Sequence, residues 1–210
     1  MIKILVVDDH AIVRAGLKQL LADTDDMLVG GEAGSGNEAI KKVREESWDV
    51  VLLDMTMPDR SGLDVLKQIK KEQPGLPVLV LSMHPEEQYA IRVLKTGASG
   101  YLNKRCVLDQ LISVIRKVAK GGSYISESVA EKLAFGSHLD AEKSPHELLS
   151  DREFQVFHLL ASGMTVSGIA GKLSLSAKTI STHRSNLLKK MNMRNNADLM
   201  RYAAENGLVS

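Results

Sequence analysis

Short apolar runs alternate with longer amphipathic segments through the first 120 residues, and this alternation limits the possible fold more than any other feature of the sequence. The runs have the length of buried strands, and the segments between them place apolar residues three and four positions apart, as amphipathic helices do. We expect strands over 3–7, 28–33, 50–53, 78–81 and 99–102, with 28–33 the weakest, and helices over 11–23, 36–46, 62–72, 86–97 and 108–121. The pattern predicts an α/β doubly wound five-stranded parallel sheet.

After Gly121 the sequence has no further strand pattern. One helix is expected over 126–135, followed by a polar linker with Gly, Ser and Pro over 136–147. Ser150 with Glu153 three positions later is typical of a helix N-terminus. Four helices are then expected, over 150–162, 166–173, 177–191 and 196–206. The chain is therefore predicted to have three parts: an α/β domain over 1–120, a helix and linker over 121–147, and a small all-α domain over 148–210.

Composition excludes several classes of protein. The whole-chain charge is only +1, but residues 172–201 hold seven basic side chains and the single acid Asp198, a local excess that suits a phosphate backbone. The single cysteine, Cys106, excludes an internal disulfide framework and is expected to be a small core residue. No apolar run reaches the roughly 18 residues of a membrane helix, and the N-terminus does not resemble a signal peptide. We expect a cytoplasmic protein.

Polar side chains follow four of the expected strands where each strand ends. Asp8 and Asp9 follow the first strand, Asp54 the third, Ser82 the fourth and Lys104 the fifth. Because the carboxyl ends of parallel strands share one edge of such a sheet, we expect these side chains to lie together. Crowded carboxylates need a cation, and Mg²⁺ prefers oxygen ligands. A carboxylate nucleophile beside a metal ion, a hydroxyl and an ammonium group indicates phosphoryl transfer.

Each of these residues alone has a simpler explanation. Asp8 or Asp9 could cap the following helix, and Lys104 could be a surface lysine. Met57 and Met83 are expected to be core residues, because magnesium does not bind thioethers. It is the combination at successive strand ends that favours a functional site.

Two histidines lie close to the same strand ends. His10 and His84 could suggest a pair of transition-metal ligands. Next to three aspartates, we instead expect loop residues that control the access of water or of a phosphodonor.

Four blocks of the first domain, VVDDH, LLDMTMPDRSG, VLSMH and GYLNK, resemble the signature blocks of the receiver domain of two-component response regulators, and the likeness extends over residues 1–120. The resemblance implies that Asp54 accepts a phosphoryl group from the phosphohistidine of a sensor histidine kinase. It also implies that Asp9, Asp54 and the backbone carbonyl of Thr56 hold Mg²⁺, with Asp8 acting through water.

The same resemblance implies roles for three further residues, and the sequence departs from the family pattern at one position. Ser82 and Lys104 would contact the phosphoryl oxygens, and Tyr101 falls at the aromatic switch position. Phosphorylation adds about −1.5 to −2 charges and three acceptor oxygens. Movement of Ser82 toward them would free space for Tyr101 to rotate. Arg105 stands where many members have proline, so the loop after the fifth strand is expected to differ in detail.

Residues 166–191 predict a helix-turn-helix, in which Ile169, Leu173, Ile180 and Leu187 face the core and SLS forms the turn. Small hydroxyls can approach base edges while long cations reach phosphates. The candidate DNA-binding residues are Lys178, Thr179, Ser181, Thr182, Arg184, Ser185 and Lys189. The pattern alone is more typical of a small helical bundle with an ordinary solvated face.

Residues 148–206 resemble the LuxR/NarL type of DNA-binding domain, through the LSDRE opening, the IAGKL helix and the TISTH segment. Relatives often have lysine where this chain has Ser181, so its base preference is expected to differ. His183 is as well suited to packing or phosphate contact as to reading a base. The last helix is expected to form a dimer contact.

These inferences combine into a NarL/FixJ-type response regulator, phosphorylated on Asp54, that forms a homodimer and binds promoter DNA. It would be a phosphoacceptor and transcription regulator, with at most self-phosphorylation and self-dephosphorylation activity. Two alternatives remain. A magnesium-dependent phosphohydrolase would need a second acid at position 56, where the chain has Thr56. A regulator that binds DNA without phosphorylation would not need the five-residue pocket.

Overall fold

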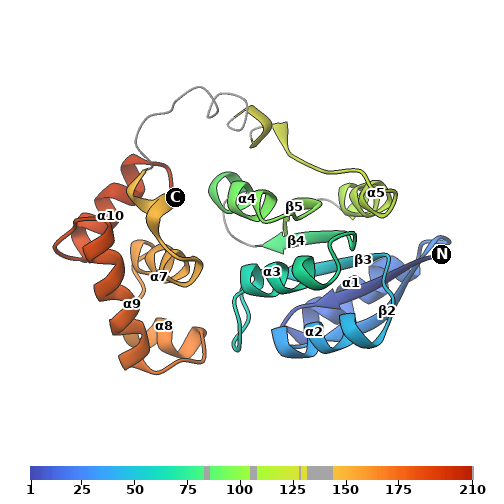
Figure 1. Cartoon of the computed structure of the whole chain (residues 1–210), viewed down its shortest axis with the longest axis horizontal. Helices are drawn as coiled ribbons and strands as arrows, with labels where there is room; N and C mark the ends of the chain where they lie inside the picture. Colours follow the sequence, from blue (N-terminus) through green and yellow to red (C-terminus); the bar gives the residue numbers. More distant parts are fainter. Residues whose placement is uncertain (83–85, 105–107, 128, 132–143, 210) are drawn as a thin grey trace. The chain divides into compact units, whose positions relative to one another are not determined.

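The computed structural model describes the chain except for residues 83–85, 105–107, 128, 132–143 and 210 (Figure 1). The predictions for Met83, His84, Arg105 and Cys106 lie outside the described residues. The chain divides into two compact units, residues 1–138 and 139–210, so that the division falls inside the segment expected to be a helix and linker. Each unit has its own core and is described by itself.

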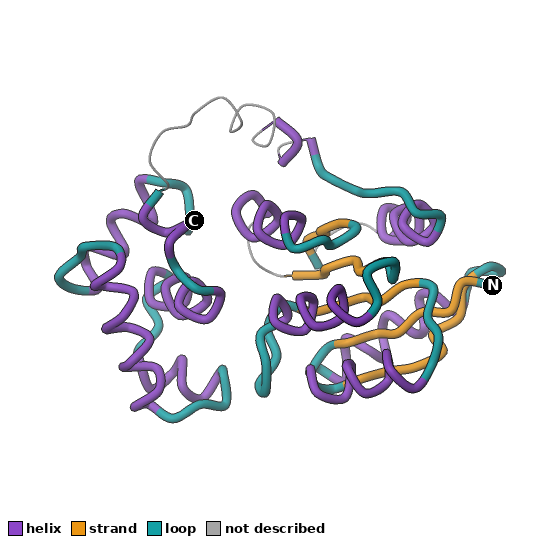
Figure 2. Tube along the Cα trace, in the orientation of Figure 1, coloured by secondary structure: helices purple, strands orange, loops and turns teal. Residues whose placement is uncertain are grey.

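The first unit contains a five-stranded parallel sheet in the order β2-β1-β3-β4-β5, which confirms the predicted doubly wound fold. Strands and helices alternate along the chain (Figure 2). The strands are β1 (Ile2–Val7), β2 (Met27–Ala33), β3 (Val50–Asp54), β4 (Val78–Ser82) and β5 (Gly100–Asn103). The helices are α1 (Ala11–Ala22), α2 (Gly36–Glu45), α3 (Gly62–Glu72), α4 (Glu86–Lys95) and α5 (Leu108–Ala119).

The sheet is buried on both faces, which explains why its central strands are apolar without alternation. All five residues of β3 and all five of β4 are buried. One face packs against α1 and α5, in a cluster that includes Val6, Leu52, Leu81, Leu21 and Ile115. Because the strands are parallel, the carboxyl ends of β1, β3, β4 and β5 lie along one edge of the sheet.

Strand β2 has the weakest strand pattern because two glycines are needed there. The pairing with β1 shifts register after Ile4, which leaves Gly30 without a partner. A Cβ atom on Gly31 would come within 2.5 Å of the Trp48 ring, and one on Gly30 within 2.8 Å of the Lys3 side chain. Lys3 Nζ in turn lies 4.4 Å from the centre of the Trp48 ring. The indole and the lysine stem thus occupy the space that side chains on this strand would fill.

In its described residues the second unit contains helices and no strand, as predicted. Its elements are η1 (Pro145–Leu148), α7 (Asp151–Ala161), α8 (Val166–Lys172), α9 (Ala177–Lys190) and α10 (Asn196–Glu205). Ser150 and Glu153 form a reciprocal capping box at the start of α7. Thr165, Ser176 and Asn195 cap the next three helices with their side chains.

A short helical turn precedes the first helix predicted in this unit, which was expected over 150–162. Residues 145–148, at the end of the expected linker, form a 3₁₀ turn. His146 Nδ1 lies 2.7 Å from the Tyr202 hydroxyl, and its ring packs beside Phe154. This contact joins the segment to α7 and α10.

Two further expectations concern helices. Of the expected helix over 126–135, positions 128 and 132–135 lie outside the described residues. Residues 127 and 129–131 are helical, and Ala130 N donates to Ser126 O at 2.9 Å. Within the part of the chain that the structure describes, no helix combines the length and the apolar character needed to cross a bilayer.

Candidate functional sites

Lys104 joins two buried carboxylates at the carboxyl edge of the sheet. Its Nζ lies 2.9 Å from Asp54 Oδ1 and 2.5 Å from Asp8 Oδ2. Asp8 is 2% exposed and Asp54 is 4% exposed. The predicted convergence of β1, β3 and β5 at one site is therefore present in the geometry.

Burial and charge oppose each other at this site. Burial raises the pKa of Asp54 to about 6, although Lys104 lowers it, and the neighbouring Asp8 raises it further. Burial also disfavours the charge on Lys104, but Asp54 and Asp8 together raise its pKa. The ammonium group is thus held charged, and it does not fully offset the carboxylates around it.

Asp9 and His10 complete the cluster. One donor atom from each of Asp8, Asp9, His10 and Asp54 lies within 4.8 Å of the others. His10 Nδ1 is 2.8 Å from Asp9 Oδ1 and 3.2 Å from Asp8 Oδ1. Three carboxylates against one lysine form a donor set that fits a hard divalent cation. His10 had been expected only to control access, and the structure brings its ring nitrogen into the cluster.

The remaining predicted residues lie around this centre. Ser82 is 1% exposed, and its carbonyl accepts a hydrogen bond from Lys104 N at 2.8 Å. Tyr101 is 2% exposed and pairs with Val80 across β4 and β5. Thr56 forms an isolated bridge with Ser61 in the turn after β3. Met57 is buried, as expected of a core methionine.

Gly62 is a residue that the sequence analysis did not identify as important. A Cβ atom at this position would come within 2.3 Å of Asp54 O and 2.6 Å of Met55 Cα. Gly62 N donates to Met55 O at 2.9 Å. The start of α3 therefore packs directly on the backbone that carries Asp54. A glycine at a helix start gives no sign of such a contact in the sequence.

Arg14 is a second such residue. Its Nη1 donates to the carbonyl of Asp8 at 2.7 Å, and its Nε donates to Glu32 Oε2 at 3.3 Å. Lys18 reaches the same Glu32 at 3.1 Å. Arg14 therefore ties the loop after β1 to β2. In the sequence it reads as a solvated residue of an amphipathic helix.

If the acidic cluster binds Mg²⁺ as predicted, replacing Arg14 with lysine should weaken that binding about tenfold, the usual cost of losing a group that orients metal ligands. The charge is kept, but an ammonium group lacks the planar fork that spans Glu32 and Asp8. Lys18→Arg is the matched control, since it keeps the charge and alters a residue that contacts Glu32. Calorimetric titration with Mg²⁺ measures both. Wild-type affinity in Arg14→Lys would contradict the positioning role.

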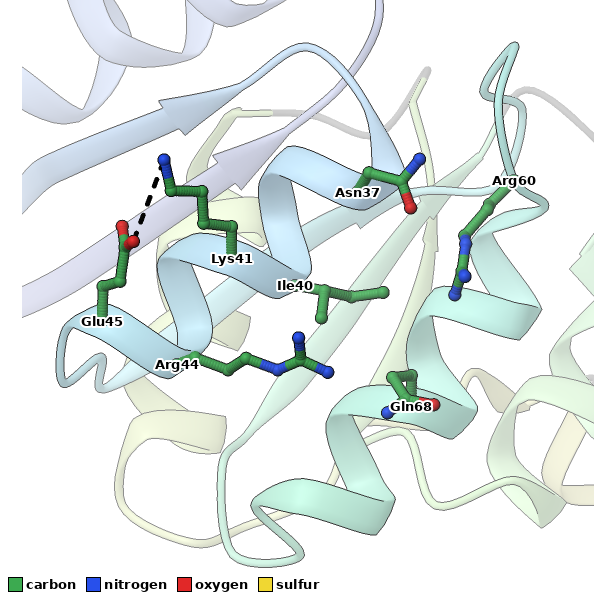
Figure 3. A pocket seen from close by; sticks show the side chains of 7 residues that line it. All are labelled: Asn37, Ile40, Lys41, Arg44, Glu45, Arg60 and Gln68. Atoms are coloured by element: carbon green, nitrogen blue, oxygen red, sulfur yellow. Dashed lines mark ion pairs between the residues drawn. The ribbon is translucent and has the colours of Figure 1, made fainter.

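A hollow of about 420 Å³ lies between α2 and α3, apart from the acidic cluster (Figure 3). Two of its cations have acidic partners: Arg44 Nε donates to Glu72 Oε2 at 2.9 Å, and Lys41 lies 3.8 Å from Glu45. None of the residues of the cluster lines it. Because its charges are largely balanced, the hollow does not compete with the acidic cluster as the candidate site.

The exposed face of α9 carries most of the predicted DNA-binding residues. Because a helix turns about 100° per residue, Lys178, Thr182, Ser185 and Lys189 fall in one row, with Ser181 beside it. All five are exposed, while Ile180 and Leu187 are buried. The turn before α9 is tight, with Ser174 at a positive φ of 51°. This arrangement is the helix-turn-helix that the sequence predicted.

Two predicted contact residues are engaged within the unit. Thr179 Oγ1 lies 2.8 Å from Ser176 Oγ, in the cap of α9. Arg184 is only partly exposed, and its Nε donates to Asn196 Oδ1 at 2.6 Å, at the start of α10. These two residues flank the exposed row of α9.

A third contact ties α9 to α7. Lys190 Nζ lies 2.6 Å from Glu153 Oε2. Burial opposes the charge on Glu153, but Lys190 and Ser150 lower its pKa. His183 is half-buried, and burial lowers its pKa. Contacts of this kind fix the orientation of the exposed face.

Comparison with known proteins assigns both units. Residues 4–116 match the response regulator receiver domain, and residues 147–203 match the luxR family of bacterial regulatory proteins. The response regulator GacA of Pseudomonas syringae pv. syringae (strain B728a) is 38% identical over 100% of this chain and 98% of its own length. The response regulator UvrY of Escherichia coli (strain K12) is 36% identical over 100% of this chain and 97% of its own length.

Solved structures agree with this assignment. RcsB from Salmonella enterica serovar Typhimurium, bound to promoter rprA in the presence of the phosphomimetic BeF₃⁻, is 27% identical with a TM-score of 0.65. The match covers 97% of this chain and 98% of that chain. The protein therefore belongs to the response regulators, and it combines a receiver domain with a LuxR-type DNA-binding domain.

Proposed function

We propose that Asp54 accepts a phosphoryl group from a sensor histidine kinase and that its phosphorylation controls the binding of promoter DNA by α9. The observation that carries this proposal is the buried contact of Lys104 with both Asp54 and Asp8. A cytoplasmic location, where such a kinase and DNA are both accessible, belongs to the same proposal.

Asp54 has one oxygen suited to attack. Its Oδ1 accepts from Met55 N at 2.8 Å and contacts Lys104 at 2.9 Å. Both of these contacts are made by Oδ1, so we assign Oδ2 as the nucleophile. In the transfer, the bond from phosphorus to the histidine nitrogen breaks, the bond to Oδ2 forms, and the nitrogen keeps the electron pair. With its pKa near 6, Asp54 is ionised at neutral pH, as a nucleophile must be.

The acidic cluster supports a role for Mg²⁺. Asp9, Asp54 and the carbonyl of Thr56 would hold the ion, and Asp8 would support it through water. When bound, the ion would neutralise phosphoryl oxygens during transfer. Lys104 and Ser82 would hold the transferred group, and a shift of Ser82 would change the space available to Tyr101. Ser82 and Tyr101 are both buried, which supports a coupling between phosphorylation and the position of Tyr101.

Turnover of small phosphoesters, the alternative function, is less well supported by the residues that the structure describes. A hydrolase would need a second acid to protonate the leaving group. Position 56 offers Thr56, in a bridge with Ser61, where that acid would stand. We therefore expect at most slow release of phosphate from the protein's own aspartyl phosphate.

Binding of a promoter fragment at fixed salt tests the proposed control. Beryllofluoride with Mg²⁺ should tighten binding of the wild-type protein and leave Asp54→Asn unchanged. RcsB, a structural relative, was solved on promoter DNA with this phosphomimetic, which makes it a suitable probe. Equal responses of the two proteins would overturn the proposal. A dimer reading half-sites about one DNA turn apart is the expected bound form.

The cations of α9 should fall into two groups by the salt dependence of DNA binding. Lys178→Ala and Lys189→Ala should each weaken binding and lower the magnitude of the salt slope by about one, as expected for phosphate contacts. Lys190→Ala should leave the slope unchanged and lower the free energy of unfolding by about 1 kcal/mol, because Lys190 is held by Glu153. Titrations at several salt concentrations, with thermal unfolding, measure both. A slope change in Lys190→Ala equal to that of Lys178→Ala would contradict this division.

A further inference from the structure

After α5 the chain turns back and pairs with the outer edge of β5. Gly121, at a positive φ of 82°, follows the helix, and Tyr124 N then donates to Ser99 O at 2.8 Å. An isolated parallel bridge joins Tyr124 to Gly100, so residues 122–125 extend the sheet by one residue pair. These four residues, called the strap below, begin the segment that leads from the receiver domain to the DNA-binding unit.

The strap is closely packed at this place. A Cβ atom on Gly100 would lie 3.0 Å from Tyr124 O and 3.1 Å from Tyr124 Cβ, closer than side chains normally pack. The Tyr124 ring packs against the core cluster that α1 and α5 cover. Gln110 Nε2, on α5, donates to the Tyr124 hydroxyl at 2.7 Å. A glycine in β5 and a glutamine on α5 therefore both serve the contact with Tyr124.

The strap lies beside the residue that is expected to respond to phosphorylation. Gly100 precedes Tyr101 in β5, and Tyr101 pairs with Val80 of β4 on the other side of the strand. Side chains that follow one another in a strand point to opposite faces. Tyr101 therefore lies on the face opposite to Leu102, which belongs to the core cluster that Tyr124 packs against. A rotation of the Tyr101 ring would act on the strap through the backbone of β5.

The strap is also held weakly enough to be released. It pairs with β5 at one residue, whereas β4 pairs with β5 at four. Ile125, its last residue, is 40% exposed. Segments with few hydrogen bonds and exposed side chains open more readily than the interior of a sheet. Because the strap is closed while Asp54 is unmodified, a response to phosphorylation can only open it.

We propose that the strap holds the start of the interdomain segment against β5 while Asp54 is unmodified, and that phosphorylation of Asp54 opens it. This inference rests on the proposed role of Asp54 and on the expected rotation of Tyr101. Opening frees the segment between the two units, so that two DNA-binding units can approach each other on DNA. The closed strap thus restrains DNA binding, and the phosphoryl group shifts the population toward the open form.

Hydrogen exchange of the full chain measures the opening directly. The Tyr124 amide should be protected in the unmodified protein and should exchange at least about tenfold faster with beryllofluoride and Mg²⁺. The Ser99 amide, which donates to Val78 O at 2.8 Å between β4 and β5, is the matched control and should keep its protection. If the Tyr124 amide stayed protected while promoter binding tightened, the strap would be wrong and the proposed function would stand.

Two variants should loosen the strap without phosphorylation. Tyr124→Phe and Gln110→Ala each remove the hydrogen bond to the Tyr124 hydroxyl, and each should tighten promoter binding of the unmodified protein about fivefold, the usual effect of one hydrogen bond. Neither should change the affinity measured with beryllofluoride. Gln73→Ala is the matched control, because Gln73 Nε2 donates to Val43 O at 2.7 Å, outside the strap. It should lower the free energy of unfolding and leave promoter binding unchanged.

The remaining outcomes separate the strap from the proposed function. Wild-type affinity in both strap variants, or equal tightening in Gln73→Ala, would contradict the strap as a restraint on DNA binding. If beryllofluoride left promoter binding of the wild type unchanged, the proposed control by Asp54 would itself be wrong, and opening of the strap by phosphorylation would fall with it.

Discussion

Asp54→Asn is expected to stabilise the receiver domain at neutral pH, by about 2–3 kcal/mol, even though it removes the proposed phosphorylation site. The reason is the raised pKa of Asp54. Its folded value of about 6 lies above the unfolded value of 3.8, chiefly because of burial. The contribution of Asp54 to the free energy of unfolding is fully present below pH 3.8 and is lost as pH rises through about 6. Above that pH the folded state carries a buried charge beside Asp8.

The stabilisation should therefore depend on pH and on metal. Chemical unfolding should show a clear difference between wild type and Asp54→Asn at pH 7.5 and a much smaller one at pH 4. Saturating Mg²⁺ should stabilise the wild type and affect the variant little. A variant less stable than the wild type at pH 7.5 would contradict this view of the site.

Asp59→Asn is the matched control, in the same turn after β3. The Asp59 carboxylate accepts from Gly36 N and Asn37 N, each at 2.9 Å. Burial opposes its charge, but these amide groups lower the pKa of Asp59. The stabilisation that the Asp59 carboxylate contributes is present above the pKa of Asp59 in the unfolded state. It is lost as pH falls through the lower pKa of the folded state. Asp59→Asn should therefore destabilise the domain at neutral pH, the opposite of Asp54→Asn.

Gly62→Ala is expected to destabilise the receiver domain by about 3 kcal/mol or more and to abolish metal binding. The new Cβ atom would overlap the backbone of Asp54 and Met55, at 2.3 Å from a carbonyl oxygen and 2.6 Å from a Cα atom. Backbone atoms cannot move aside as the end of a side chain can, so the site must distort. Thermal unfolding and Mg²⁺ titration measure the two effects.

Gly16→Ala is the control for a glycine inside a helix of the same domain. A Cβ atom at Gly16 has nothing within 4 Å, and the position is exposed in α1. Alanine there should stabilise the domain by about 0.5–1 kcal/mol through helix propensity alone. Opposite signs at Gly62 and Gly16 support the packing argument. Equal small effects at the two positions would show that Gly62 is not needed for close approach.

The sheet could be predicted because burial on both faces leaves a direct mark on the sequence. Short apolar runs such as Val50–Asp54 and Val78–Ser82 are explained by strands that are buried on both faces. The parallel order of these strands then places their carboxyl ends at one edge of the sheet. β2 was the weakest prediction for a physical reason. Its Gly30 and Gly31 make room for Trp48, which belongs to a distant segment, so no local pattern records the contact.

The candidate site was predictable where a residue's chemistry was unusual for its position. Asp54 at the end of an apolar strand is such a residue, and so is Lys104 after the last strand. Arg14 and Gly62 were missed because their roles depend on backbone atoms of Asp8 and Asp54. An arginine on a helix face and a glycine at a helix start are common in any protein.

The proposed DNA-binding face of α9 shows the same limit of prediction from sequence. The spacing along α9 identified the exposed row of Lys178, Thr182, Ser185 and Lys189. It could not show that Arg184 is held by Asn196 on the next helix, because that contact depends on how α9 and α10 pack. Spacing predicts which face a residue occupies, and packing decides which cations remain available for phosphate.

The central claim is that Asp54 is the phosphoacceptor, and the mass of the protein after incubation with acetyl phosphate and Mg²⁺ tests it most directly. The wild type should gain the mass of one phosphoryl group, Asp54→Asn should gain none, and borohydride reduction should place the modified residue at position 54. A gain that persists in Asp54→Asn, or that maps to another residue, would contradict the account.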